Sequence, residues 1–383
     1  MKRFIRNLKL YLSSPFANMS RFLSILFRKQ SHKGPLMAAV SITSRCHTHC
    51  LMCWYHSPLL KKEEDFNLIS PRELSFDVLK KLFSDFKRLG GKRLFITGEG
   101  EPFNHPEILN ILKLIKDLNV ELFLLTNLAN LSLEKARLLF ESGIVHIEVS
   151  SHGVSENVLK EIYPVLHFRQ IQDGIAGLEE LIKIRNKFGR PRIEIIHAIF
   201  KQNIEDLENM IKQAVNLKVD KLTLKRGIFN SELKDRLNPS QEQLENAFSV
   251  IRKYQNITIR NNLISFVESL QKDSFSDFKE SVQKSEKAGK PDVDNYRFCY
   301  IPYLSTNIES DGTVNPCIYD PFAPKPGNIN NSSFRDIWFS KEYQNYRKER
   351  RCPVCLAFSL YPFMKTIKNF TGFCNHFKKK NRQ

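Results

Sequence analysis

The sequence contains no apolar run of the roughly 18–20 residues that a membrane-spanning helix needs. The apolar stretch at 22–27 is too short and too interrupted for the core of a signal peptide. No internal repeat is present, and 15 glycines in 383 residues exclude a collagen-like chain. These absences predict a globular protein of the cytoplasm, in which the eight cysteines are metal ligands or reactive thiols rather than disulfides.

Acidic residues are missing from one part of the chain and scarce in another. The formal net charge is +18, yet residues 1–35 carry eight Lys or Arg and no acid. Residues 341–383 carry eleven Lys or Arg against two Glu, which leaves a net charge of only +1 for the body of the chain. A neutral body argues against nucleic acid as a partner that covers the whole surface.

Residues 1–35 are predicted to form basic amphipathic helices. Phe22, Ile25 and Leu26 lie on an apolar stripe, and Arg28 belongs to the cationic side. One interpretation is a helix packed on the body with its charges in solvent. The other is attachment to RNA or to an anionic membrane surface, which would place the protein at the periphery of a membrane.

From residue 36 onward, extended apolar runs alternate with segments of helical periodicity. Six β–α units in succession predict an α/β fold whose parallel sheet curls into a barrel or part of one. In such folds the chemistry lies in the loops that follow the strands. The expected strands are 36–42, 93–97, 121–126, 144–150, 193–200 and 221–225, and the expected helices include 132–142, 174–188, 204–217 and a stretch near 240–256.

Cys46, Cys50 and Cys53 form a C-x3-C-x2-C motif directly after the first expected strand. Three thiolates within eight residues can hold three irons of a [4Fe–4S] cube and leave the fourth iron open. Two alternatives remain. The cysteines could share one buried helix face, or they could bind tetrahedral zinc with a fourth ligand from this loop, namely His47, His49 or His56.

The cysteine motif and three later motifs, taken in order along the chain, resemble those of the radical S-adenosylmethionine (SAM) superfamily. Thr97-Gly98-Glu99-Gly100-Glu101-Pro102 resembles the family's GxGEP turn, with Glu99 at a usual glycine position. Thr126-Asn127 follows the third strand and Ser150-Ser151-His152-Gly153 follows the fourth, similar to the family's motifs there. The resemblance covers roughly residues 36–226 and implies a partial (β/α)6 barrel.

The resemblance also implies which residues contact SAM. The turn after strand two would receive its methionine end, and a serine after strand four would contact the ribose. A residue beside the third cysteine would lie near the adenine. The SAM contacts expected on this basis are Met52, Trp54, Gly98, Glu99, Gly100, Glu101, Asn127, Ser150 and Ser151.

Four later cysteines form a second constellation: Cys299, Cys317, Cys352 and Cys355. Their spacing alone also fits a zinc ribbon. Their surroundings, including Asp311-Gly312 and a later Asp-Ile-Trp segment, resemble the SPASM/twitch extension of radical SAM enzymes. That extension implies an auxiliary [4Fe–4S] cluster with four cysteine ligands. The remaining Cys374 is predicted to be a packed or surface thiol, or otherwise a substitute ligand.

Five segments are expected along the chain. They are the basic N-terminal helices (1–35), a radical SAM core barrel (36–228), a linker or covering element (229–297), a cysteine-rich SPASM/twitch domain (298–358) and a basic tail (359–383).

The resemblance implies an oxidoreductase that cleaves SAM reductively at a [4Fe–4S] cluster, with flavodoxin or ferredoxin as electron donor. The resulting 5′-deoxyadenosyl radical would take a substrate hydrogen, and the auxiliary cluster would accept an electron from the substrate. By position, the candidate proton acceptors are Lys225 and Arg226 after the sixth strand, His152 after the fourth, and Tyr319 or Asp320 beside Cys317.

Three hypotheses remain for the substrate. The favoured one is a small molecule such as a sugar, because the 35 residues before the barrel are too few for a leader-peptide-binding domain. The second is a peptide or protein, as for maturases of the SPASM type. The third is a zinc-stabilised RNA- or membrane-binding module that does no radical chemistry.

Overall fold

The computed structural model describes residues 33–60, 71–165, 168–227, 229, 231–254, 258–259, 262–263, 265–267, 297–298, 301–317, 323–349 and 351–352. The predicted N-terminal helices up to residue 32 and the basic tail lie outside the described residues, as do Cys299, Tyr319, Asp320, Cys355 and Cys374.

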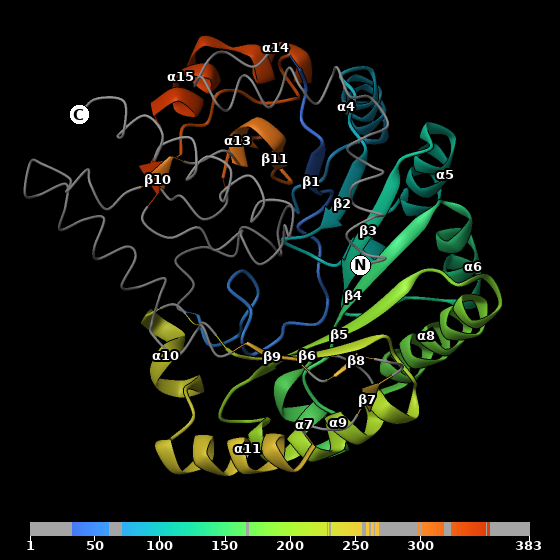
Figure 1. The fold of residues 1–383 in the computed structure, drawn as a ribbon, viewed down its shortest axis with the longest axis vertical. Coiled ribbons are helices and arrows are strands. Elements are labelled where there is room, and N and C mark those ends of the chain that lie inside the picture. The colour runs from blue at the N-terminus through green and yellow to red at the C-terminus, as the bar shows by residue number, and fades with distance from the viewer. Residues whose placement is uncertain are drawn as a thin grey trace, which may run out of the picture.

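One open sheet of nine strands forms the body of the molecule (Figure 1). Its order is β12-β11-β1-β2-β3-β4-β5-β6-β9, and all neighbours are parallel except β12, which is antiparallel to β11. No pairing among the described strands closes the sheet between β9 and β12. The predicted partial barrel is therefore confirmed. The strands are β1 (Met37–Ser41), β2 (Arg93–Thr97), β3 (Glu121–Thr126), β4 (Ile144–Ser150), β5 (Arg192–Ile199), β6 (Lys221–Arg226), β9 (Ser265–Val267), β11 (Ser305–Ile308) and β12 (Val314–Asn315).

The two faces of the sheet differ because side chains alternate along each strand. On the outer face, apolar residues such as Val40, Ile96 and Leu124 are almost fully buried against the helices. The inner face of strands β2 to β6 instead carries polar and charged side chains, including Arg93 and Glu194. The apolar core therefore lies between the sheet and the helices, and the polar inner face is left to line the barrel.

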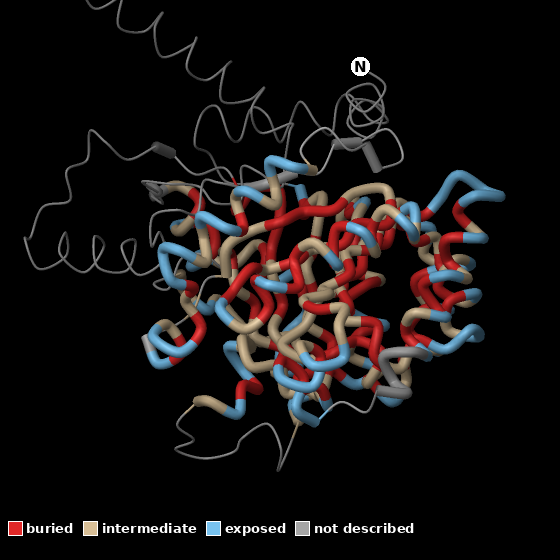
Figure 2. The backbone as a smooth tube through the Cα atoms, turned by 90° about the horizontal axis from the view of Figure 1, so that it is seen from below, coloured by how far each residue is buried: buried red, intermediate tan, exposed pale blue. Residues whose placement is uncertain are grey.

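The helices cover the outer face of the sheet, with α4, α5, α6 and α8 along one side in Figure 1. Ser75 and Ser132 cap the first turns of α4 and α6, because each hydroxyl accepts a bond from a backbone N–H three residues on. Figure 2 shows that buried segments run through the middle of the described body and exposed ones around it. The helices are α4 (Phe76–Arg88), α5 (Ile108–Leu118), α6 (Leu133–Glu141), α7 (Glu156–Ile162), α8 (Phe168–Phe188), α9 (Leu207–Asn216), α10 (Ser231–Leu237) and α11 (Gln241–Tyr254).

Several boundaries differ from the sequence prediction. Helix α8 begins six residues earlier than expected, at Phe168, and α7 and α10 were not predicted. The segment expected to be a linker also contributes β9, which extends the sheet beside β6. Short helices and two- or three-residue strands carry too little periodicity to be recognised in a sequence.

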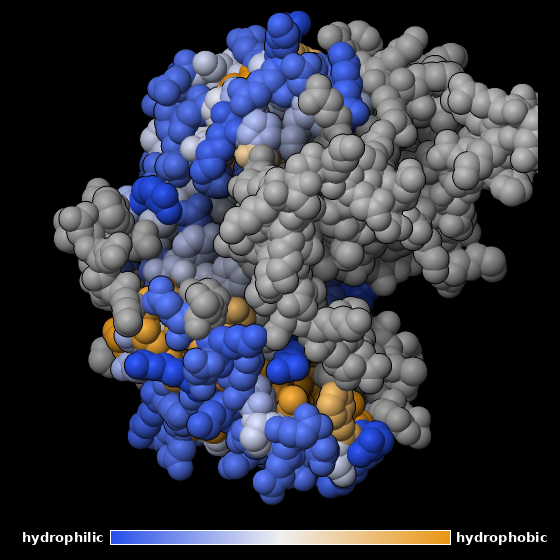
Figure 3. All heavy atoms as spheres, turned by 90° about the vertical axis from the view of Figure 1, so that its left-hand side faces the viewer, coloured by the Kyte–Doolittle hydropathy of each residue, from blue (hydrophilic) through white to orange (hydrophobic). Residues whose placement is uncertain are grey.

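Within the described segments, no helix combines the length and apolarity needed to cross a membrane. The described surface on the face drawn in Figure 3 is mostly hydrophilic, with smaller apolar areas in its lower half.

The C-terminal segment is joined directly to the barrel sheet. Strand β11 pairs in parallel with β1, so that Met37 lies opposite Ser305. Helices α13 (Ile301–Leu304), α14 (Phe334–Phe339) and α15 (Lys341–Glu349) pack around this extension. A separate two-stranded sheet pairs β10 (Arg297–Phe298) with β13 (Arg351–Cys352). We call residues 297–352 the C-terminal module.

A buried arginine holds the C-terminal module together. Arg347 is fully buried, and its guanidinium donates to the carbonyls of Pro302 (2.9 Å) and Trp338 (2.8 Å). The same group lies 3.9 Å from the ring centres of both Trp338 and Tyr343. Trp338 in turn donates from its indole to the Lys33 carbonyl at 2.9 Å. Burial lowers the pKa of Arg347 to about 10, so the group stays charged at neutral pH.

We expect Arg347→Lys to lower the free energy of unfolding by about 2–3 kcal/mol, because an ammonium cannot serve both carbonyls and stack on two rings. Urea unfolding followed by tryptophan fluorescence would measure this loss. The exposed Lys341→Arg on the same helix should change stability by less than about 0.5 kcal/mol. Equal denaturation midpoints for the two variants would contradict the role assigned to Arg347.

Candidate active site

The three cysteines of the first motif lie on the loop that follows β1. The loop is fixed at its start, because Ser44 exchanges two hydrogen bonds with the backbone of Arg72 at 2.8 and 2.9 Å. Thr48 lies between two of the thiols, with its hydroxyl 3.0 Å from Cys46 Sγ and 3.4 Å from Cys50 Sγ. The backbone N–H groups that follow the third cysteine, Tyr55 and His56, donate to Cys53 Sγ at 3.4 and 3.3 Å.

The electrostatics of this loop fit a bound metal cluster. Burial raises the pKa of all three thiols, and the charges on Cys46 and Cys53 raise that of Cys50 further. Such a group of thiolates is stable only with a cation between them, since a coordinating metal deprotonates a thiol outright. Among the described residues, no three His, Cys, Asp or Glu side chains already stand in metal-binding geometry. The fit of this loop to a metal cluster therefore rests on the chemistry of its three cysteine thiols.

The turn after β2 packs tightly against the cysteine loop. Gly100 N donates to Thr43 O at 3.1 Å, and Glu101 N donates to Arg45 O at 3.0 Å. A Cβ on Gly100 would stand 2.4 Å from Arg45 O, and one on Gly98 would stand 2.0 Å from Gly100 O. Both glycines are required by the close approach of the backbone.

Glu101 joins the ends of two neighbouring strands. Its carboxylate is buried and accepts bonds from Thr126 Oγ1 (2.7 Å), Asn127 N (2.8 Å) and Phe103 N (3.2 Å). Burial raises its pKa to about 7, although these three donors act in the opposite direction. The predicted contacts Glu101 and Asn127 are thus adjacent in space.

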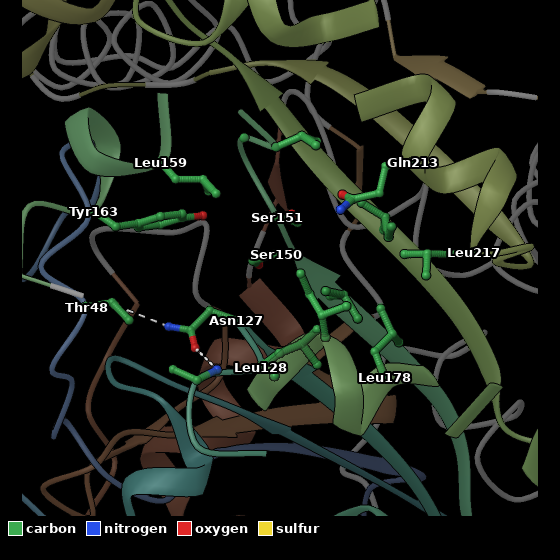
Figure 4. A pocket seen from close by; sticks show the side chains of 17 residues that line it. Thr48, Asn127, Leu128, Ser150, Ser151, Leu159, Tyr163, Leu178, Gln213 and Leu217 are labelled. Carbon is green, nitrogen blue, oxygen red and sulfur yellow. Dashed lines mark hydrogen bonds between the residues drawn. The ribbon is translucent and has the colours of Figure 1, made fainter. Parts of the chain in front are cut away.

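A pocket opens beside these residues at the ends of β3 and β4 (Figure 4). Asn127, Ser150 and Ser151, all predicted from the sequence to contact SAM, line it together with Thr48. Asn127 Nδ2 donates to Thr48 Oγ1 at 3.2 Å, which ties the pocket to the cysteine loop. Tyr163 of the α7 cap also lines the pocket.

The two predicted adenine contacts do not line this pocket themselves. Trp54 is 42% exposed, and Met52 packs against an apolar cluster that includes Ile162 and the pocket residue Leu159. Neither residue is among those lining the pocket.

His152 follows β4 and is enclosed by other parts of the fold. Its Nδ1 accepts a bond from Ala198 N at 3.2 Å, and its carbonyl accepts one from Asn203 Nδ2 at 2.8 Å. Burial, with contributions from His197 and Lys225, lowers its pKa to about 3. His152 is therefore neutral at pH 7 and holds the loop after β4 in place. The neighbouring His197 does the same through a bond of 3.1 Å from Nδ1 to Ser151 O.

The inner face of the sheet holds an acid, Glu148, and a cation, Lys225, that interact electrostatically. Glu148 lies beside Glu194 on the neighbouring strand, and burial followed by the Glu194 charge raises the pKa of Glu148 to about 7. The Lys225 charge lowers the pKa of Glu148, and burial lowers the pKa of Lys225 itself. Lys225 makes no hydrogen bond or ion pair with any residue that the structure describes.

Sequence reasoning found Lys225 but missed Glu148. The signal was present in β4, where His146, Glu148 and Ser150 alternate with apolar residues and so share one face. Arg226 ends β6 and is half-buried. Glu194 accepts hydrogen bonds from Lys221 and Thr223, each at 2.6 Å. Glu148 is therefore the acid with the weaker hydrogen bonding of the two.

Two of the later cysteines are described in part. Cys317 follows the hairpin of β11 and β12, and its N–H donates to Asn315 Oδ1 at 3.0 Å. Cys352 lies on β13, opposite Arg297 of β10. Arg297 is two residues before Cys299 in the sequence. The strand pairing thus places Cys352 beside the strand that directly precedes Cys299 in the sequence.

Two family models match the chain and together cover more than half of it. Residues 40–214 match the model of the radical SAM superfamily. Residues 299–357 match SPASM, an iron–sulfur cluster-binding domain.

Known proteins similar to the chain include several of stated activity. A PqqA peptide cyclase of Bradyrhizobium diazoefficiens is 24% identical over 57% of this chain and 54% of its own length. A GTP 3′,8-cyclase of Limosilactobacillus fermentum is 30% identical over 45% of this chain and 48% of its own. The chain thus spans about half the length of each of these relatives.

Among solved structures, the chain is similar to SuiB of Streptococcus suis, over 83% of this chain at 16% identity. The structure of SuiB with SAM bound gives a TM-score of 0.56 and is covered over 69% of its own length. The structure with the precursor peptide SuiA bound gives a TM-score of 0.53 at 17% identity and is covered over 68% of its length. At this identity the likeness shows a shared fold.

The two matched families name the cofactors, which are SAM and [4Fe–4S] clusters. The tight glycine turn, the thiol-rich loop packed against it and the pocket lined by Thr48 and Asn127 agree with that assignment. The chain belongs to the radical SAM superfamily and carries a C-terminal iron–sulfur domain of the SPASM type.

Proposed function

We propose that this chain is a radical SAM maturase that oxidises a peptide or protein substrate. The observation that carries the proposal is the similarity to PqqA peptide cyclases, two of which match over 57% and one over 83% of the chain. The shared fold with SuiB, which has been solved with a precursor peptide, supports it. This proposal replaces the small-molecule or sugar substrate that the sequence favoured.

We assign the cofactors to the residues that the site brings together. Cys46, Cys50 and Cys53 would hold the SAM-binding cluster, with the Gly98–Glu101 turn and the Asn127 pocket holding SAM. The auxiliary cluster would take its ligands from the C-terminal module and the residues directly after it, namely Cys299, Cys317, Cys352 and Cys355. A low-potential flavodoxin or ferredoxin remains the proposed electron donor, and the N-terminal helices remain a proposed membrane contact.

Bound SAM and its cluster supply a 5′-deoxyadenosyl radical that removes a hydrogen atom from the substrate. The protein must then place the substrate and accept a proton. The inner face of the sheet offers groups for both tasks, because Glu148 and Lys225 lie there and interact electrostatically, with His146 Nε2 3.8 Å from Glu148 Oε1. We propose Glu148 as the proton acceptor and Lys225, the base predicted from the sequence, as the cation that keeps Glu148 ionisable. The contacts of His152 give it a positioning role.

A second candidate is a small-molecule cyclase. It is favoured by the 30% identity to a GTP 3′,8-cyclase, which is higher than the identity to the peptide cyclases but covers less of the chain. The substrate experiment below separates the two.

Anaerobically purified full-length protein should contain about eight irons and equal labile sulfide, as two [4Fe–4S] clusters require. Replacing Cys46, Cys50 and Cys53 together by Ala should reduce this to about four. Dithionite and SAM should then release 5′-deoxyadenosine from the parent alone. Four irons in the parent, with zinc bound as well, would remove the auxiliary cluster from the proposal.

Peptides encoded by short reading frames beside the gene are the probes for the substrate. With SAM and dithionite, mass spectrometry should show a product lighter than the peptide by two hydrogen atoms, formed in proportion to 5′-deoxyadenosine. GTP tested in parallel should remain unchanged. Conversion of GTP with no change in any peptide would favour the small-molecule candidate instead.

The rate of peptide oxidation should rise between pH 6 and pH 8 if Glu148 accepts the proton. Its pKa is raised to about 7, so the ionised form that can take a proton accumulates only as the pH passes that value. Glu148→Gln should lower the rate by about 100-fold or more and abolish this rise. Lys225→Met should move the rise to higher pH, since removing a cation raises the carboxyl pKa.

The exposed Glu134→Gln should keep the parent profile and serves as the control. Retention of the pH 6 to 8 rise in Glu148→Gln would show that another group takes the proton.

A further inference from the structure

The carboxylate of Glu99 bridges the turn after β2 and the C-terminal module. Its Oε2 accepts a bond from Ser310 Oγ at 2.6 Å, and its Oε1 accepts one from Ser310 N at 3.2 Å. Arg72 Nη2 donates to Oε2 at 2.7 Å from the exposed side. The Glu99 side chain is only 8% exposed and Ser310 is 1% exposed, so solvent does not compete for the two serine bonds.

The same turn is tied on its other side to the cysteine loop. The Glu99 carbonyl accepts a bond from His56 Nε2 at 3.0 Å, and the His56 N–H donates to Cys53 Sγ at 3.3 Å. The neighbouring Gly100 N–H donates to Thr43 O. A movement of Glu99 relative to Ser310 would therefore also strain contacts with the loop that carries the thiols.

Ser310 belongs to a rigid hairpin between β11 and β12. Gly312 turns the chain with a φ of +88°, and Thr313 N donates to Asp311 Oδ1 at 2.8 Å. Asn328 Nδ2 holds the Asp311 carbonyl at 2.8 Å. Cys317 follows directly after this hairpin, so the position of Ser310 sets where the chain delivers that cysteine.

We propose that Glu99 is a positioning residue that couples the SAM-binding turn to the C-terminal module through Ser310. This inference rests on the proposed role of the Gly98–Glu101 turn in holding SAM. Charge-assisted bonds to a buried carboxylate are strong, and a ligand that fixes the turn also fixes the hairpin bonded to it. The coupling is reciprocal, because two linked sites change each other's affinity by the same factor.

Amide hydrogen exchange of the full chain, resolved by mass spectrometry, tests the bridge. In the metal-free protein, Ser310→Ala and Glu99→Gln should each speed exchange of segment 305–317 by about tenfold, whereas exchange in α9 stays unchanged. The Arg72→Gln variant removes the exposed ion pair but keeps both serine bonds. It should leave the 305–317 exchange rate within about twofold of the parent.

SAM added to the reconstituted protein tests the coupling. In the parent, SAM should slow exchange of 305–317; in Ser310→Ala, SAM should still bind by equilibrium dialysis but no longer slow that segment. Parent-like exchange in both Ser310→Ala and Glu99→Gln would overturn the bridge. A SAM effect on 305–317 that survives in Ser310→Ala would overturn the coupling.

These results separate this inference from the proposed function. If the parent bound no SAM, the role of the turn would fail and the coupling with it, while the metal-free exchange rates would still decide whether the Glu99–Ser310 bridge exists. If α9 also exchanged faster in Glu99→Gln, that variant would be globally destabilised and Ser310→Ala alone would decide.

Discussion

Burial of one face of the parallel sheet against the helices is the constraint on which the site depends. Apolar side chains on the outer face, such as Val40 and Leu124, make this packing the main source of stability. Because side chains alternate, the same packing turns Glu148, Glu194 and Lys225 inward. It also brings the loops after β1 to β4 to one edge of the sheet, where the thiols, the glycine turn and the Asn127 pocket meet.

Polar groups at that edge are held by a few buried side chains that each serve several loops. Glu101 connects the turn after β2 to the end of β3 through three bonds. Thr48 connects two thiols to Asn127. Burial of a carboxylate costs free energy unless donors surround it, and the pKa of Glu101 is raised because burial outweighs its three donors. These buried side chains fix the loops of this edge relative to one another.

The C-terminal module is integrated with the core in two ways. Strand β11 continues the barrel sheet beside β1, and Trp338 bonds to the backbone of Lys33. Its interior is organised around Arg347, a cation stabilised by carbonyls and aromatic faces. A module attached so firmly keeps Cys317 at a defined position relative to the first cysteine loop.

The sequence by itself determined the family and the succession of the first six strands, and it predicted the first set of ligands. Strands β2, β3 and β4 have the predicted limits, because buried parallel strands are continuous apolar or alternating runs between loops that are easily recognised. The C-x3-C-x2-C spacing is local, so it too is visible without a fold. Tertiary structure decided what depends on distant contacts. It turned His152 into a buried positioning group, brought Glu148 within electrostatic range of Lys225, and set Glu99 against Ser310, 211 positions away. Those properties arise from neighbours brought together by packing, which local sequence patterns do not encode.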